Sequence, residues 1–108
     1  MRLTTEEKAY QVARARAELK LAYAFSRAHS RLAVWAEGAY GAQGATISGV
    51  YREHFPQPVK ERLRRLASMV SERLAYSRSA WRQAGKRQST WQRLRQNIIR
   101  AYGRGFYG

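Results

Sequence analysis

The sequence predicts an all-α protein in which two long amphipathic helices pack antiparallel and a shorter C-terminal helix completes a small helical bundle. Two stretches, about 5–37 and about 58–84, contain no internal glycine or proline. Apolar side chains recur in both at spacings of three and four residues, which is the period of one helical face. No segment has the two-residue alternation of a paired strand. A chain of 108 residues fits a single domain.

The first predicted helix covers about residues 5–37 and begins with a capping signal. Thr4 is followed three residues later by Glu7, which is the spacing of a capping box. The helix is rich in alanine, the residue with the highest helix propensity. Its predicted buried stripe consists of Tyr10, Ala13, Ala17, Leu21, Ala24, Ala28, Leu32 and Trp35. Four further apolar residues widen this stripe: Val12, Leu19, Tyr23 and Phe25.

A glycine-rich loop is predicted over residues 38–57. Four glycines lie between positions 38 and 49, a density that interrupts regular structure and favours a mobile loop. Their spacing matches neither a Walker A motif nor a dinucleotide-binding motif, so we expect no phosphate-cradling loop here. Residues 50–55 are expected to form one turn of helix, because Pro56 and Pro58 disfavour helix in the residues before them.

The second predicted helix covers about residues 58–84. Pro58 suits the first position of a helix, and Gly85 suits the position just after its end. Its apolar stripe is the most regular in the chain: Val59, Leu63, Leu66, Val70, Leu74, Ser77 and Trp81. The heptad-like spacing of both long helices also suits pairing with a second copy of the chain, so a homodimer is an alternative to pairing within one chain.

The third predicted helix covers about residues 90–102, with Ser89 or Thr90 as its cap. Gly103 is expected to end this helix and to leave a non-helical tail over 103–108. Its apolar face consists of Trp91, Leu94, Ile98 and Tyr102. Because Trp81 and Trp91 both fall on apolar stripes, we expect both indoles in the core.

The charge of the chain is large and unevenly distributed. There are 21 lysines and arginines against 7 acidic residues, which gives a net charge of +14 and a pI near 11.3. Seventeen of the cations are arginines, whose planar guanidinium binds phosphate or carboxylate in a bidentate manner. The 36 residues after Glu72 contain nine cations and no acidic residue. Such an imbalance predicts a polyanionic partner.

Helical spacing is expected to gather these cations into a basic ridge around the junction of the second and third helices. Arg78, Arg82 and Lys86 recur every four residues, and the amides at the start of the third helix favour an anion nearby. The predicted nucleic-acid-binding residues are Arg73, Arg78, Arg82, Lys86, Arg87, Gln88, Thr90, Arg93, Arg95, Arg100 and Arg104. The candidates for stacking on unpaired bases, because they lie outside every apolar stripe, are Phe106 and Tyr107.

The preferred interpretation is a small accessory protein that contacts the phosphate backbone, with DNA favoured over RNA. A helix–turn–helix over residues 79–98 is a sequence-reading alternative, whose readers would be Gln88, Thr90, Gln92, Arg93 and Gln96. The alternative function is a non-enzymatic protein-interaction module, such as an inhibitor, adaptor or assembly factor, docking on an acidic partner protein. Its docking surface would include the four residues that widen the first stripe. Binding to anionic lipid ranks last, because the core needs the apolar faces.

Catalysis and metal binding are not expected. The chain has no cysteine and no aspartate, and neither His29 nor His54 has the spacing of a zinc motif. Both histidines are expected at ordinary surface or partly buried positions, and the seven glutamates form no evident catalytic pair. We therefore predict a non-enzyme without metal or cofactor. The lack of cysteine, of a signal sequence and of a run of about 20 apolar residues predicts a cytoplasmic protein without a membrane span.

Overall fold

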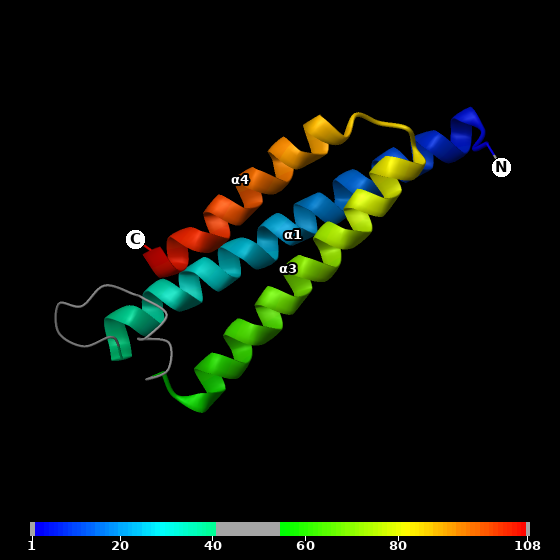
Figure 1. Ribbon diagram of the computed structural model, residues 1–108. Helices are drawn as coiled ribbons and strands as arrows, with labels where there is room; N and C mark the ends of the chain where they lie inside the picture. Colours follow the sequence, from blue (N-terminus) through cyan, green and yellow to red (C-terminus); the bar gives the residue numbers. More distant parts are fainter. Residues whose placement is uncertain (1, 41–54, 108) are drawn as a thin grey trace.

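The computed structural model describes the backbone of residues 2–40 and 55–107, and the side chains of residues 2–40 and 55–100. Within these ranges the chain forms the helices α1 (Thr5–Tyr40), α3 (Gln57–Gln83) and α4 (Gln88–Tyr107), and no strand (Figure 1). The predicted all-α bundle, with two long helices packed antiparallel and a shorter third, is confirmed.

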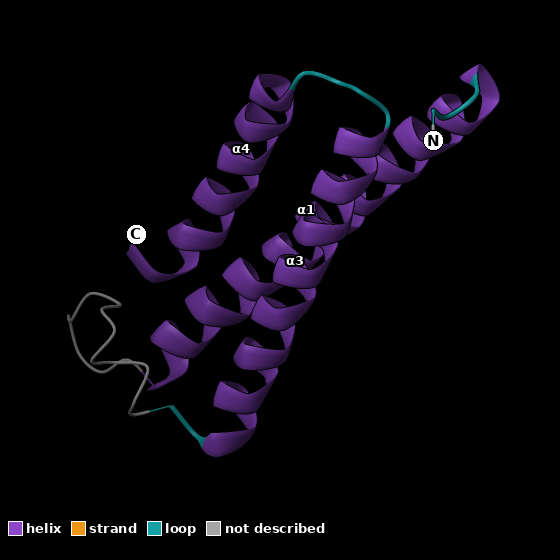
Figure 2. Ribbon diagram, turned by 45° about the vertical axis from the view of Figure 1, so that its right-hand side comes forward, coloured by secondary structure: helices purple, strands orange, loops and turns teal. Residues whose placement is uncertain are grey.

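α1 is the central helix of the bundle. Figures 1 and 2 show α3 running antiparallel to α1, and α4 returning beside α1 in the same direction as α1. α1 packs extensively on both other helices, whereas α3 and α4 contact each other much less. The result is an elongated body with extents of 57 × 24 × 16 Å. Its length is close to the roughly 54 Å expected for a straight helix as long as α1.

The two ends of α1 show how the sequence defines it. At the N-terminus the amide of Glu7 donates to Oγ1 of Thr4 (3.1 Å), so the predicted cap is confirmed. At the other end the helix continues through Gly38 to Tyr40, beyond the predicted end. The rest of the predicted glycine-rich loop, including the expected turn of helix and His54, lies almost entirely outside the described residues.

The buried side of α1 is not the predicted one. Of the predicted stripe only Leu32 is partly buried, and its other members are exposed. Val12, Leu19 and Phe25, which were expected only to widen that stripe, pack in or against the main core. The buried residues of α1 are mostly small: Ala15, Leu19, Ala22, Ser26, His29, Ala33 and Ala36. Small side chains allow α3 and α4 to approach the α1 backbone closely, which large side chains at Tyr10 or Trp35 would prevent.

α3 matches its prediction closely. Its buried residues are Leu63, Leu66, Val70, Leu74, Ser77, Ala80 and Trp81. The helix ends in a Schellman motif: the amide of Lys86 donates to the carbonyl of Trp81 (3.2 Å), and that of Gly85 donates to the carbonyl of Arg82 (3.0 Å). Gly85 has a φ of 71°, the left-handed conformation that this motif requires.

Two glycine-to-alanine substitutions are expected to have opposite effects on stability. Gly85→Ala will lower the free energy of unfolding by about 1 kcal/mol, because alanine is strained at positive φ. Gly38→Ala will raise it by about 0.5–1 kcal/mol, because alanine is the better residue inside a helix. A Cβ at either position meets nothing within 4 Å, so steric clashes do not obscure the comparison. Urea unfolding of both variants measures the difference, and changes of equal sign would contradict this account.

α4 is longer than predicted at both ends. It begins at Gln88, so Ser89 and Thr90 lie in its first turn and do not cap it. It also continues through Gly103 to Tyr107, so the predicted non-helical tail over 103–108 is wrong for all residues that the structure describes. Glycine lowers helix propensity by only about 1 kcal/mol, which neighbouring helix-forming residues offset. Trp91 and Ile98 are buried as predicted, whereas Leu94 is 37% exposed.

Candidate nucleic-acid interface

The end of the molecule formed by α3, α4 and their short connection carries most of the predicted binding residues. The connection is held by the buried Trp81, whose Nε1 donates to the carbonyl of Arg87 (3.0 Å). α3 and α4 then run in nearly opposite directions as a helical hairpin (Figures 1 and 2). The two helices of a DNA-reading helix–turn–helix cross at about 90–120°. An antiparallel hairpin does not have that crossing, so the geometry gives the helix–turn–helix interpretation no support.

Trp91 links α4 to both other helices. Its ring is 2% exposed, and its Nε1 donates to Oγ of Ser77 on α3 (3.0 Å). The hydroxyl of Ser77 in turn donates to the carbonyl of Ala15 on α1 (3.1 Å). This chain of hydrogen bonds joins α4, α3 and α1 through buried groups. It fixes the relative position of α3 and α4, and with it the spacing of the cations that they carry. The core positions predicted for Trp81 and Trp91 are confirmed.

Two arginines from different helices converge on the Trp91 ring. Cζ of Arg78 on α3 lies 5.8 Å from the ring centroid, and Cζ of Arg95 on α4 lies 6.0 Å from it. An aromatic ring attracts guanidinium groups at such distances. The two like charges are thereby held on one part of the surface, on either helix of the hairpin. An anion that binds between or across them would relieve their repulsion.

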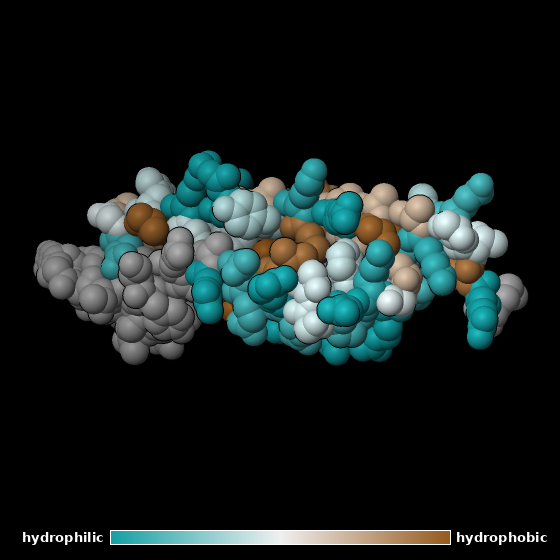
Figure 3. Space-filling model, turned by 90° about the horizontal axis from the view of Figure 1, so that it is seen from above, coloured by the Kyte–Doolittle hydropathy of each residue, from teal (hydrophilic) through white to brown (hydrophobic). Residues whose placement is uncertain are grey.

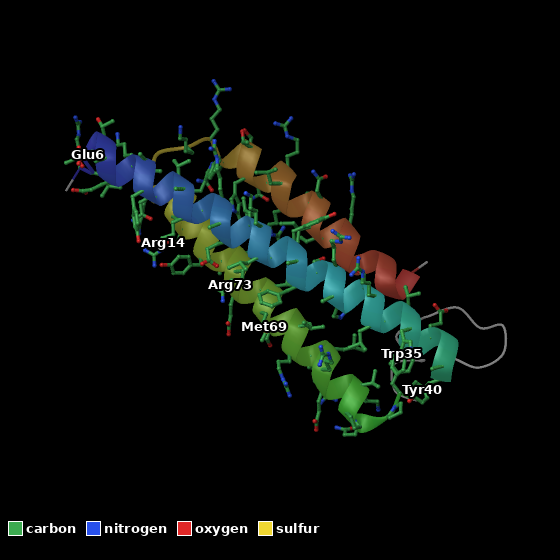
Figure 4. The ribbon with its side chains drawn as sticks, turned by 180° about the vertical axis from the view of Figure 1, so that it is seen from behind. Glu6, Arg14, Trp35, Tyr40, Met69 and Arg73 are labelled. Carbon is green, nitrogen blue, oxygen red and sulfur yellow. The ribbon has the colours of Figure 1, made fainter. Side chains whose placement is uncertain are left out.

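Apart from Arg73, the remaining described arginines and lysines of the predicted set are exposed to solvent. Arg82 lies in the last turn of α3, and Lys86 and Arg87 lie in the connection. Arg93 and Arg100 lie on α4, two turns apart and on the side away from Trp91 and Ile98. In the view from behind, nitrogen-tipped side chains project outward from α4 (Figure 4). We call the seven exposed or partly exposed cations of this hairpin the hairpin cations: Arg78, Arg82, Lys86, Arg87, Arg93, Arg95 and Arg100.

Arg73 does not share this arrangement. Its Nη1 lies 3.0 Å from Oε2 and 3.2 Å from Oε1 of Glu18 on α1, and Figure 4 shows it at the junction of these two helices. The Glu18 side chain is 15% exposed and that of Arg73 is 41% exposed, so this pair is partly shielded from salt. The sequence-based assignment of Arg73 to the binding set overlooked Glu18, because that partner is 55 residues away in the chain.

The five other predicted site residues lie on α4, and the structure shows fewer contacts for them. Gln88 and Thr90 are partly exposed in the first turn of α4, beside the free amides of its N-terminus. Arg104, Phe106 and Tyr107 lie within α4, but their side chains are outside the described residues. Their predicted roles in phosphate contact and base stacking therefore stay predictions.

Two further cations of α3 share a stripe with part of the predicted set, more than three turns away from it. Lys60 and Arg64 lie on the same stripe of α3 as Arg78 and Arg82. Each pair is four residues apart, and fourteen residues, close to four full turns, separate Arg64 from Arg78. A shallow groove between α1 and α4 is lined by Leu19, Lys20, Tyr23, Leu94, Asn97 and Ile98. From above, hydrophilic residues predominate around a compact hydrophobic group near the middle (Figure 3).

Other kinds of site find no support in the part of the chain that the structure describes. No three histidine, cysteine or acidic residues there lie close enough together to hold a metal ion. None of the helices described has the length and apolar character required to cross a membrane. His29 is 1% exposed in α1, more buried than the sequence predicted.

No known protein family, curated protein or solved structure matches this chain.

Proposed function

We propose that this protein binds the phosphate backbone of a nucleic acid through the hairpin cations, without catalysis, as a small accessory protein of the cytoplasm. One observation carries the proposal. Within the described residues the only ion pair between a basic and an acidic side chain is Arg73–Glu18. The hairpin cations thus form a group of seven positive charges without acidic partners.

The physical chemistry of these cations favours a phosphate polymer over a small anion. A solvated basic helix face normally carries glutamates three or four residues away, which offset part of the charge. Here that compensation is missing after Glu72, so the charges repel one another until a polyanion covers them. Because several positions along the hairpin carry charge, a polymer with regularly spaced phosphates can contact several of them at once.

The hairpin favours contact with the backbone over reading of bases. α3 and α4 each pack lengthwise against α1, so neither helix projects alone in the way that a recognition helix enters the major groove. Arginines that bind phosphates position a protein on a nucleic acid but carry no sequence information. We therefore expect weak dependence on sequence, and we favour duplex DNA because helices bearing exposed arginines can follow its two phosphate rows.

Reversal of two hairpin charges tests the proposal. In gel-shift titrations with duplex DNA, single-stranded DNA and RNA, the double variant Arg82→Glu with Arg93→Glu will bind at least about tenfold more weakly than the unmodified protein. The matched control is Arg62→Glu with Arg65→Glu, which changes the total charge equally at exposed positions of α3 outside the hairpin cations. We expect the control to lose less than half as much binding energy.

Two results would contradict the proposal. Equal weakening by both double variants would show that only the total charge matters and that the hairpin is not a site. Absence of retardation with all three nucleic acids at low salt would reject nucleic-acid binding altogether. The rank order of the three nucleic acids decides between DNA and RNA.

A further inference from the structure

α1 exposes a continuous apolar stripe that no part of the described chain covers. The outer stripe of α1 consists of Tyr10, Ala13, Ala17, Leu21, Ala24, Ala28 and Trp35, all of them exposed. Its large members are well exposed: Tyr10 by 62%, Trp35 by 54% and Leu21 by 41%. Isolated apolar residues on a surface need no explanation, but a contiguous apolar strip marks an interaction surface.

The spacing of the outer stripe fits a second helix lying along α1. Its members are three, four or seven residues apart, so they remain on one side of the helix over about 38 Å. Large side chains stand at Tyr10, Leu21 and Trp35, and alanines lie between them. Large side chains form ridges and the alanines between them leave grooves. The ridges of a second helix can pack into such grooves.

The charges beside the outer stripe identify the partner's chemistry. Between residues 9 and 36 every exposed charged side chain of α1 is positive: Arg16, Lys20, Arg27 and Arg31 follow one edge of the stripe and Arg14 lies at the other, while the exposed Glu6 and Glu7 precede Tyr10. The one acidic residue in this range, Glu18, is 15% exposed and paired with Arg73. A helix that packs on the outer stripe must therefore place carboxylates next to these cations.

A second copy of the chain does not meet this requirement. It would bring the same arginines and lysines to the interface, and in an antiparallel pair the edge that carries Arg16, Lys20, Arg27 and Arg31 would face its own copy. A nucleic acid would satisfy the cations but leave the apolar side chains without a matching surface. We infer that the outer stripe of α1 binds an acidic amphipathic helix of a partner protein, one with apolar residues at spacings of three and four flanked by glutamate or aspartate.

This surface differs from the one proposed for a protein partner on sequence grounds. Of the four residues that widen the predicted stripe, Val12, Leu19 and Phe25 pack in or against the core, and only Tyr23 is exposed. The outer stripe is also separate from the hairpin cations, which lie on α3, α4 and their connection. The inference is therefore independent of nucleic-acid binding.

Trp35 provides a direct measurement, because Trp81 and Trp91 are buried and Trp35 is the exposed tryptophan. The probe is a synthetic 28-residue helical peptide with leucine and alanine at the two apolar heptad positions and glutamate at the flanking ones. We expect saturable one-to-one binding to the full chain with a blue shift of Trp35 emission. A scrambled peptide of the same composition, which has the same charge but no apolar face, is expected to bind at least tenfold more weakly.

A pair of matched variants locates the site. Ala24→Glu, in the middle of the outer stripe, is expected to weaken peptide binding at least tenfold. Ala75→Glu makes the same change at an exposed position of α3 and is expected to weaken it less than twofold. The double variant Arg82→Glu with Arg93→Glu is expected to bind the heptad peptide more tightly than the scrambled peptide, as the unmodified protein does, even if its nucleic-acid binding is lost.

Five outcomes would overturn the inference. The first three are absence of saturable binding of the heptad peptide, equal binding of the scrambled peptide, and equal effects of the two alanine substitutions. The fourth is a dimer of the purified chain that Ala24→Glu converts to a monomer, which would make a second copy the occupant. A blue shift of Trp35 caused by DNA and abolished by Ala24→Glu would likewise assign the stripe to nucleic acid.

Discussion

Replacing Trp91 with alanine is expected to lower the free energy of unfolding by about 3–5 kcal/mol. The indole is buried where α4 meets the other helices, and its loss leaves a cavity that small neighbours such as Ser77 and Ala15 cannot fill. The substitution also removes the donor to Oγ of Ser77. A domain of this size is stable by only about 5–15 kcal/mol, so the effect is a large fraction of the total.

Urea unfolding with two companion variants separates the causes of this loss. Trp91→Phe keeps most of the ring volume but removes the indole donor, and we expect a loss of about 1–3 kcal/mol. Trp35→Ala removes the same side chain from an exposed position and is expected to cost less than about 1 kcal/mol. If Trp91→Ala were as mild as Trp35→Ala, Trp91 would not be the link between α4 and the rest of the bundle.

Nucleic-acid binding is expected to weaken on the order of a thousandfold between 50 and 200 mM salt. Each phosphate contact releases counterions from the nucleic acid, so the logarithm of affinity falls linearly with the logarithm of salt concentration. If most of the hairpin cations contact duplex DNA, the slope will be about −5 to −7. Fluorescence anisotropy with a labelled duplex at a series of salt concentrations gives this slope.

The ion pair of Arg73 with Glu18 makes the salt experiment residue-specific. Arg82→Gln removes an unpaired cation and is expected to reduce the magnitude of the slope by about 0.9. Arg73→Gln removes a cation that already has a carboxylate partner, so the slope is expected to stay unchanged within error. A larger change for Arg73→Gln than for Arg82→Gln would mean that the ion pair opens on binding and that Arg73 does contact phosphate.

The sequence predicted α3 well and the buried side of α1 poorly, for one physical reason. In α3 large aliphatic residues lie on one side and charges on the others, so the pattern identifies the core. α1 carries apolar residues on several sides, and two of the largest, Tyr10 and Trp35, lie on the exposed stripe. Its buried positions are alanines, Ser26 and His29, whose burial follows from close helix packing rather than from hydrophobicity. Only the position of α3 and α4 against it decides which side is inside.

The candidate interface was predictable where it depends on local spacing and unpredictable where it depends on distant contacts. The exposure of Arg82, Arg93 and Arg100 follows from their positions relative to the apolar stripes. The pairing of Arg73 with Glu18 and the approach of Arg78 and Arg95 to Trp91 need the packing of separate helices. The course of α4 through Gly103 and Gly105 shows that isolated glycines are weak signals for the end of a helix.

The bundle has extents of only 24 and 16 Å across its long axis, little more than the width of two helices. A body this slender has almost no interior beyond the line where its three helices touch. Each helix therefore exposes a separate flank to solvent. The hairpin cations and the outer stripe of α1 have no side chain in common. A rod of this shape can be contacted along two separate flanks at once.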